Sequence, residues 1–138
     1  MGRSAVIPDF TDDGCLPVGM HPATLGEIAA HFGQEPELRR VQMESLQWLV
    51  ELARRAGVQR VVVGGSFVTD KWEPNDVDCL LLQGPAFGHD EEADNELRAG
   101  LPFIDMVVVR KADFDLYVDQ IYGTDRHGNA RGLVVVIL

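Results

Sequence analysis

Two aspartates one residue apart follow a glycine turn near the middle of the chain. Gly64-Gly65-Ser66 comes directly after the apolar run 61–63, and Asp76-Val77-Asp78 opens a second apolar run, 79–82. Side chains alternate along a strand, so Asp76 and Asp78 are predicted on one face and Val77 on the other. Two neighbouring carboxylates repel each other unless a cation neutralises them. The spacing therefore predicts a site for a divalent metal ion that prefers oxygen ligands.

The glycine turn suits a ligand that approaches the backbone closely. Gly64 and Gly65 carry no Cβ, so the chain can turn sharply there and come close to a bound group. The hydroxyl of Ser66 and the amides after it could face an anion such as a phosphate. Ser66 could equally be only the N-cap of a short helix, and both interpretations stay open.

A third carboxylate stands inside a later apolar run. Asp105 lies between Ile104 and Met106 in the stretch 103–109, which predicts a core strand. Burying an unpaired carboxylate is costly, and this cost favours a functional role for Asp105. Two structural alternatives remain: Asp105 caps a turn at a strand end, and Asp78 pairs with an arginine.

Taken in this order, the Gly-Gly-Ser turn, Asp76-Val77-Asp78 and Asp105 resemble the signature of the DNA polymerase β-like nucleotidyltransferase superfamily. The opening Ile7-Pro8-Asp9-Phe10 and the closing stretch 125–134 are similar to those of a group of short, mostly uncharacterised prokaryotic proteins with this core. The resemblance spans nearly the whole chain, and it brings no known substrate with it.

The resemblance implies an enzyme that moves a nucleoside monophosphate from an NTP, by default ATP, to a hydroxyl acceptor with the help of Mg²⁺ or Mn²⁺. It implies that Asp76, Asp78 and Asp105 are the catalytic residues and the metal ligands, with Asp105 on the acceptor side. The implied nucleotide-binding residues are Gly64, Gly65 and Ser66, to which proximity alone adds Thr69 and Lys71. Lys71 could instead be ordinary surface charge.

Larger members of that superfamily carry an extra domain that holds the base and the acceptor, and a chain of 138 residues has no room for one. A second copy of the chain or a partner protein would have to complete the site. The alternative function is therefore a nucleotidyltransferase-like binding module without independent activity, working through a partner as in a toxin–antitoxin pair. A structural protein with a coincidental aspartate cluster is the third possibility.

The length predicts one domain over 1–138, and the resemblance implies that it is a minimal nucleotidyltransferase-like domain. Its expected class is α+β (α/β), with a small mixed β-sheet and helices packed on one side. Residues 1–23 are predicted to be an extended N-terminal arm anchored by Phe10, Leu16 and Val18. Thr24 and Glu27 have the spacing of a capping box, so a helix is expected there, ending at Gly33.

A second helix is expected from about Pro36 to Ala56, before Gly57. Trp48 is predicted to widen its core-facing stripe, and the pairs Arg39-Arg40 and Arg54-Arg55 to face solvent. The stripe itself comprises Leu38, Val41, Ser45, Leu49, Leu52 and Ala56.

The remaining segments are less distinctive. The acidic stretch 89–96 could be a short exposed helix, but a mobile, solvated segment is the favoured interpretation. The apolar positions of 114–121 favour a short helix, and 133–138 reads as a terminal strand.

Composition limits the classes of partner and the cellular compartment that we expect. The net charge of −10 argues against a nucleic-acid partner, because phosphate neutralisation needs lysine and arginine. The apolar runs are strand-sized, so no membrane span is expected. The N-terminus lacks a basic region followed by an apolar core, so no signal peptide is expected. Cys15 and Cys79 are the two cysteines, and a reducing, cytoplasmic setting is the default expectation.

Overall fold

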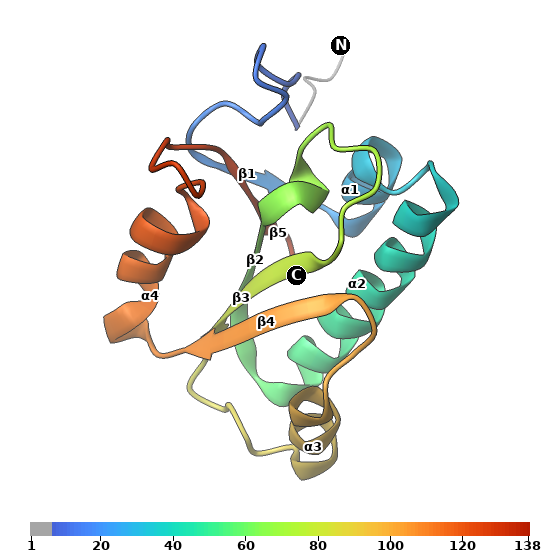
Figure 1. Cartoon of the computed structure of the whole chain (residues 1–138). Helices are drawn as coiled ribbons and strands as arrows, with labels where there is room; N and C mark the ends of the chain where they lie inside the picture. The colour runs from blue at the N-terminus through green and yellow to red at the C-terminus, as the bar shows by residue number, and fades with distance from the viewer. Residues whose placement is uncertain (1–6) are drawn as a thin grey trace, which may run out of the picture.

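The computed structural model describes residues 7–138, which form an α+β fold of four α-helices and a five-stranded mixed sheet (Figure 1). No helix within this range is both long enough and apolar enough to cross a membrane. The elements follow in the order β1 (Met20–Ala23), α1 (Leu25–Phe32), α2 (Glu37–Ala56), β2 (Val58–Gly64), the 3-10 helix η1 (Gly65–Val68), β3 (Val77–Gln83), α3 (Glu91–Ala99), β4 (Ile104–Val109), α4 (Lys111–Tyr117), the π-helix η2 (Val118–Tyr122) and β5 (Leu133–Val136).

The first two helices begin and end where their capping residues predict. The Glu27 amide donates to the Thr24 hydroxyl at 3.1 Å, and the Thr24 amide donates to Glu27 Oε1 at 2.8 Å. These two bonds confirm the capping box and satisfy two amides that the first turn of α1 leaves unpaired. Gly57 ends α2 with φ 86°, a left-handed conformation that glycine adopts without a Cβ clash.

The buried face of α2 differs from the predicted stripe. Val41 and Trp48 are 40% and 52% exposed and do not join the core, whereas Leu46 and Val50 are fully buried. Arg39 is the second correction, because it is 5% exposed rather than solvated; Arg40, Arg54 and Arg55 are exposed as predicted. A charged side chain is buried in α2 because loop carbonyl oxygens surround it, and those partners lie about 30 residues further along the chain.

The acidic segment is a regular helix rather than a loop. Asp90 caps α3 by accepting a hydrogen bond from the Ala93 amide at 3.0 Å, and Ala93 and Leu97 are buried. The acidic residues of its first turn lie where the helix dipole favours negative charge. The short helix predicted near 114–121 is present as α4 followed by η2.

The sheet has the strand order β1-β5-β2-β3-β4. Strand β5 runs parallel to β1 and antiparallel to β2, β2 runs antiparallel to β3, and β3 runs parallel to β4. The last strand of the chain therefore lies inside the sheet, between the first strand and β2.

Helices cover both faces of the sheet, so the prediction of helices on one side is wrong. One core packs α1, α2 and α3 against one face, and a smaller core of seven buried residues packs α4 and η2 against the other (Figure 1). The second face needs its own cover because Val62, Leu80 and Leu133 point away from α2 and are apolar. We refer to this side of the sheet as the α4 face.

The N-terminal arm is shorter than predicted. Met20–Ala23 forms strand β1, so the arm ends before residue 20, and its first six residues lie outside the described range. Leu16 is buried and Phe10 packs against the core, as expected, and Ile7 is buried as well. Val18 is 69% exposed and is not part of either hydrophobic core, so it does not anchor the arm as predicted.

Candidate functional site

The carboxylates of Asp78 and Asp105 come from neighbouring parallel strands. Asp78 on β3 is the register partner of Asp105 on β4, and Gly64 at the end of β2 lies opposite Asp78. Alternation along β3 places Cys79 in the larger core and Leu80 in the smaller one. Asp78 therefore lies on the α4 face, and its register partner Asp105 lies on the same side.

A pocket of about 180 Å³ opens where these strands meet the α4 face. The glycine turn, both strands, η2 and the segment before β5 each contribute to its wall. The lining residues are Gly65, Asp78, Asp105, Ile121, Tyr122 and Arg131.

Glycine is required at the turn because the Asp78 carboxylate occupies the space of a side chain. Gly65 has φ 71°, and a Cβ built there would run into Asp78 Oδ2. A Cβ at Gly64 would come within 2.8 Å of Leu133 Cδ2. Gly65 thus lets the turn and the carboxylate share one small volume, and Gly64 leaves room for Leu133.

The environment of Asp78 favours its neutral form. Burial raises the pKa of Asp78 to about 6, and the carboxylates of Asp105 and Asp76 add to the increase, while Arg131 opposes it. A half-buried carboxyl beside two others has an unfavourable charge that a bound cation would relieve. The same three aspartates that the sequence predicts are therefore coupled electrostatically in the structure.

The three aspartates are not equivalent. Asp76 is exposed and precedes β3, so it lies outside the strand ladder. Asp105 is exposed too, and the inference from the cost of burying it was wrong: the edge strand β4 leaves that position open to solvent. Within residues 7–138 no three His, Cys, Asp or Glu side chains form a ready-made metal cage.

The other nucleotide-binding candidates divide into two groups. Gly65 lines the pocket, and Gly64 and Ser66 adjoin it in the chain, although Ser66 lies inside η1 and the N-cap is Gly64. Thr69 donates its hydroxyl proton to the Ser66 carbonyl oxygen at 2.7 Å, and Lys71 is exposed. Neither Thr69 nor Lys71 lines the pocket.

Two polar residues of the pocket were missed by the sequence analysis. The Tyr122 hydroxyl donates to the Cys79 carbonyl oxygen at 3.2 Å, and burial together with Asp78 raises the pKa of this phenol above its usual value. Tyr122 therefore stays protonated and holds η2 against β3. Arg131 is the second residue, and it lies in the closing stretch 125–134, whose resemblance to other proteins assigned it no role.

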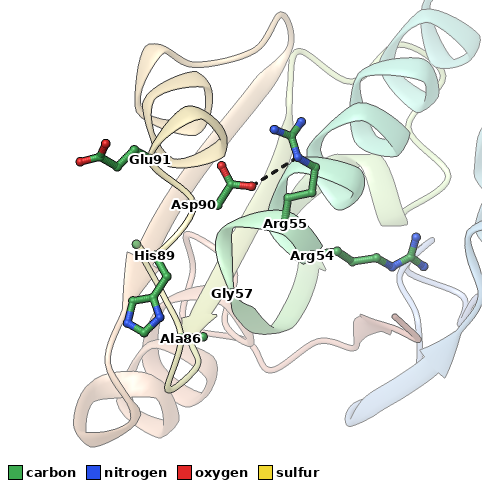
Figure 2. A pocket seen from close by; sticks show the side chains of 8 residues that line it. Arg54, Arg55, Gly57, Ala86, His89, Asp90 and Glu91 are labelled. Atoms are coloured by element: carbon green, nitrogen blue, oxygen red, sulfur yellow. Dashed lines mark ion pairs between the residues drawn. The ribbon is translucent and has the colours of Figure 1, made fainter.

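A larger hollow, of about 800 Å³, lies at the opposite ends of β2 and β3 (Figure 2). Arg55 points toward Asp90 across it, at 3.7 Å between Nε and Oδ2, while Arg54 points away (Figure 2). Its charged groups are exposed and already paired in part, so it offers no group held ready for a ligand. The smaller pocket is the better candidate because its carboxyl has a perturbed pKa and a defined charge neighbourhood.

The fold and this pocket define an α+β protein with two facing carboxylates on one face of a mixed sheet. The chain belongs to DUF6932, a family of unknown function, whose model matches residues 8–137. No curated protein and no solved structure matches the chain.

Proposed function

We propose that this protein is a metal-dependent nucleotidyltransferase that moves a nucleoside monophosphate from an NTP to a hydroxyl acceptor. One observation carries the proposal: Asp78 and Asp105 are register partners on adjacent strands, beside a glycine turn that a Cβ would block. This juxtaposition supplies paired oxygen ligands next to backbone that a phosphate can approach.

The residues fit a divalent cation that arrives with its nucleotide. Magnesium is commonly held by one or two carboxylates plus substrate phosphates and water, so a complete protein cage is not needed. Asp78 and Asp105 would hold it, with Asp76 adding negative charge from outside the strand. When bound, divalent cations neutralise the triphosphate and stabilise the entering and leaving oxygens.

The chain's own groups divide the remaining work. The exposed Asp105 is open to an incoming acceptor and would accept its hydroxyl proton as the oxygen attacks the α-phosphorus and pyrophosphate leaves. The backbone of Gly64, Gly65 and Ser66 would lie against the phosphates. Tyr122 keeps its proton and holds η2 against β3 beside the glycine turn.

The pocket's size favours the alternative function as well. Its 180 Å³ is below the roughly 300–1,000 Å³ of ordinary small-molecule sites, so a base and an acceptor would extend beyond it. A second copy or a partner protein would then cover them. The alternative proposal is a nucleotide-binding module that works only with that partner.

A thermal-shift panel tests the proposal. Wild type, Asp78→Asn/Asp105→Asn and the control Asp113→Asn/Asp115→Asn are melted with each of four NTPs, with and without Mg²⁺ or Mn²⁺. The control removes two exposed carboxylates of α4 that do not line the pocket. A ligand at about 100 times its dissociation constant stabilises the folded state by about 2.7 kcal/mol, which is several degrees for a chain of this size.

The expected result is a metal-dependent shift with at least one NTP, kept in the control and lost in the site variant. An equal shift in the site variant would refute the assignment of the site. No shift with any NTP in wild type would refute independent nucleotide binding and favour the partner-dependent module.

A further inference from the structure

Arg131 reaches the carboxylate pocket from a tightly held backbone. Its amide donates to the Gly123 carbonyl oxygen at 2.9 Å, and the Gly132 amide donates to the Leu16 carbonyl oxygen at 3.1 Å. A Cβ at Gly132 would clash with the Pro17 carbonyl oxygen. The chain is therefore fixed on both sides of Arg131, in a segment that joins η2 to β5.

The Arg131 side chain carries an unsatisfied donor within the part of the chain that the structure describes. Its Nε is buried without a hydrogen-bond acceptor, and within residues 7–138 its guanidinium forms no ion pair. Asp78 is close enough for Arg131 to oppose the rise in its pKa, yet the two side chains form no ion pair. Leaving a buried donor unpaired is unfavourable, so the position calls for an acceptor that residues 7–138 do not supply.

The pocket lining thus includes two carboxylates and a guanidinium that forms no ion pair with either of them. A cation alone would satisfy the carboxylates and leave Arg131 unpaired, and an anion alone would be repelled by the carboxylates. A complex of a divalent cation with a polyphosphate satisfies both sets of groups at once. Guanidinium matches phosphate oxygens through paired N–H donors.

We propose that Arg131 binds the polyphosphate of a metal–nucleotide complex whose cation lies on Asp78 and Asp105. This assignment rests on the proposed function, because it places the triphosphate of the NTP between the carboxylates and Arg131. Arg131 is a better candidate than Lys71 for the phosphate-binding cation, because Arg131 lines the pocket and Lys71 does not.

The test compares Arg131→Met with Arg126→Met. Arg126 is exposed in the same turn-rich segment and outside the pocket lining, so both variants remove one positive charge from the same region. Affinities for Mg²⁺–tripolyphosphate, Mg²⁺–ATP and Mn²⁺ alone are measured by calorimetry. Circular dichroism checks folding, and Arg131→Lys is measured alongside in case the methionine variant does not fold.

In Arg131→Met we expect at least a roughly tenfold loss of affinity for Mg²⁺–tripolyphosphate, which corresponds to about 1.4 kcal/mol. Arg131→Lys should recover part of the affinity, since lysine keeps the positive charge but lacks the paired N–H donors of the guanidinium. Arg126→Met should match wild type, and binding of Mn²⁺ alone should not fall in any of the three variants.

Failure of this inference can be told apart from failure of the proposed function. If Mg²⁺–ATP binds through Asp78 and Asp105 but Arg131→Met leaves its affinity unchanged, the role of Arg131 is refuted and the proposed function stands. If tripolyphosphate binding depends on Arg131 but no NTP binds, the anion site stands and the nucleotide function is refuted. Equal losses in Arg131→Met and Arg126→Met, or no tripolyphosphate binding by wild type, would overturn the inference.

Discussion

Asp78 lines the candidate site, and its charged form is unfavourable there. Its register places it beside Asp105, its carboxylate occupies the space above Gly65, and burial makes its charged form unfavourable. A carboxyl placed this way destabilises the empty protein at neutral pH and gains most from a cation. Such a cost is what we expect of the ligand site proposed above.

The pH dependence of stability checks this description. The folded pKa of Asp78, about 6, exceeds its ordinary value of 3.8, so the folded chain retains this proton over a pH range in which the unfolded chain has released it. The contribution of Asp78 to stability therefore falls as pH rises from about 4 to above 6. Asp78→Asn should be more stable than wild type by about 1 kcal/mol at pH 8, a figure reduced for solvent screening of a half-buried group, and not at pH 4.

Urea denaturation at pH 4, 6 and 8 measures the difference. Asp115→Asn, an exposed change on α4, is the matched control and should show no such trend with pH. A gain of equal size at pH 4 and pH 8 would show that ionisation of Asp78 is not its source.

At the scale of elements, Arg39 joins helix α2 to the loop that follows the glycine turn. Its guanidinium donates to the carbonyl oxygens of Phe67 at 2.7 Å and Thr69 at 2.9 Å, and also to those of Phe32 and Lys71. It lies 5.3 Å from the centre of the Phe67 ring. One buried cation thus fixes the loop 67–71 against the helix and, with it, the end of the Gly-Gly-Ser turn.

Replacing Arg39 with methionine should cost about 3 kcal/mol, since several buried carbonyl oxygens lose a charged donor. Arg40→Met is the control: Arg40 is the exposed neighbour, and its loss should cost less than about 0.5 kcal/mol. Urea denaturation measures both. A small cost for Arg39→Met would mean that water replaces the guanidinium and that the loop does not depend on it.

Over the whole molecule, the sheet separates two cores, and the pocket lies at the edge of the smaller one. Phe114 and Val118 of α4 and η2 are buried against the α4 face, and the same segment continues to Ile121 and Tyr122 in the pocket wall. Packing on the α4 face therefore positions one side of the candidate site.

Phe114→Ala should cost about 3 kcal/mol, because it removes a ring that is 7% exposed from a small core. It should also weaken Mg²⁺–nucleotide binding by loosening the pocket wall. Leu116→Ala, at a position 52% exposed on the same helix, should change neither quantity measurably. Urea denaturation and the thermal-shift panel together test this link, which fails if Phe114→Ala loses stability but keeps full nucleotide affinity.

Much of the local structure could be predicted from the sequence because its causes act over a few residues. The Thr24–Glu27 capping box, the Gly57 stop and the alternation around Asp78 depend on neighbours in the chain, and the structure confirms each. The resemblance to the superfamily signature, not spacing alone, grouped Gly65, Asp78 and Asp105, and these three residues line one pocket.

Strand order and helix placement, by contrast, were decided by tertiary structure. Only the insertion of β5 between β1 and β2 brings the segment with Arg131 to the carboxylates, and only the packing of α4 on the second face adds Tyr122. The burial of Arg39 likewise depends on carbonyl oxygens about 30 residues away. Periodicity reports which face of an element is apolar, whereas the partner of that face depends on how distant segments pack.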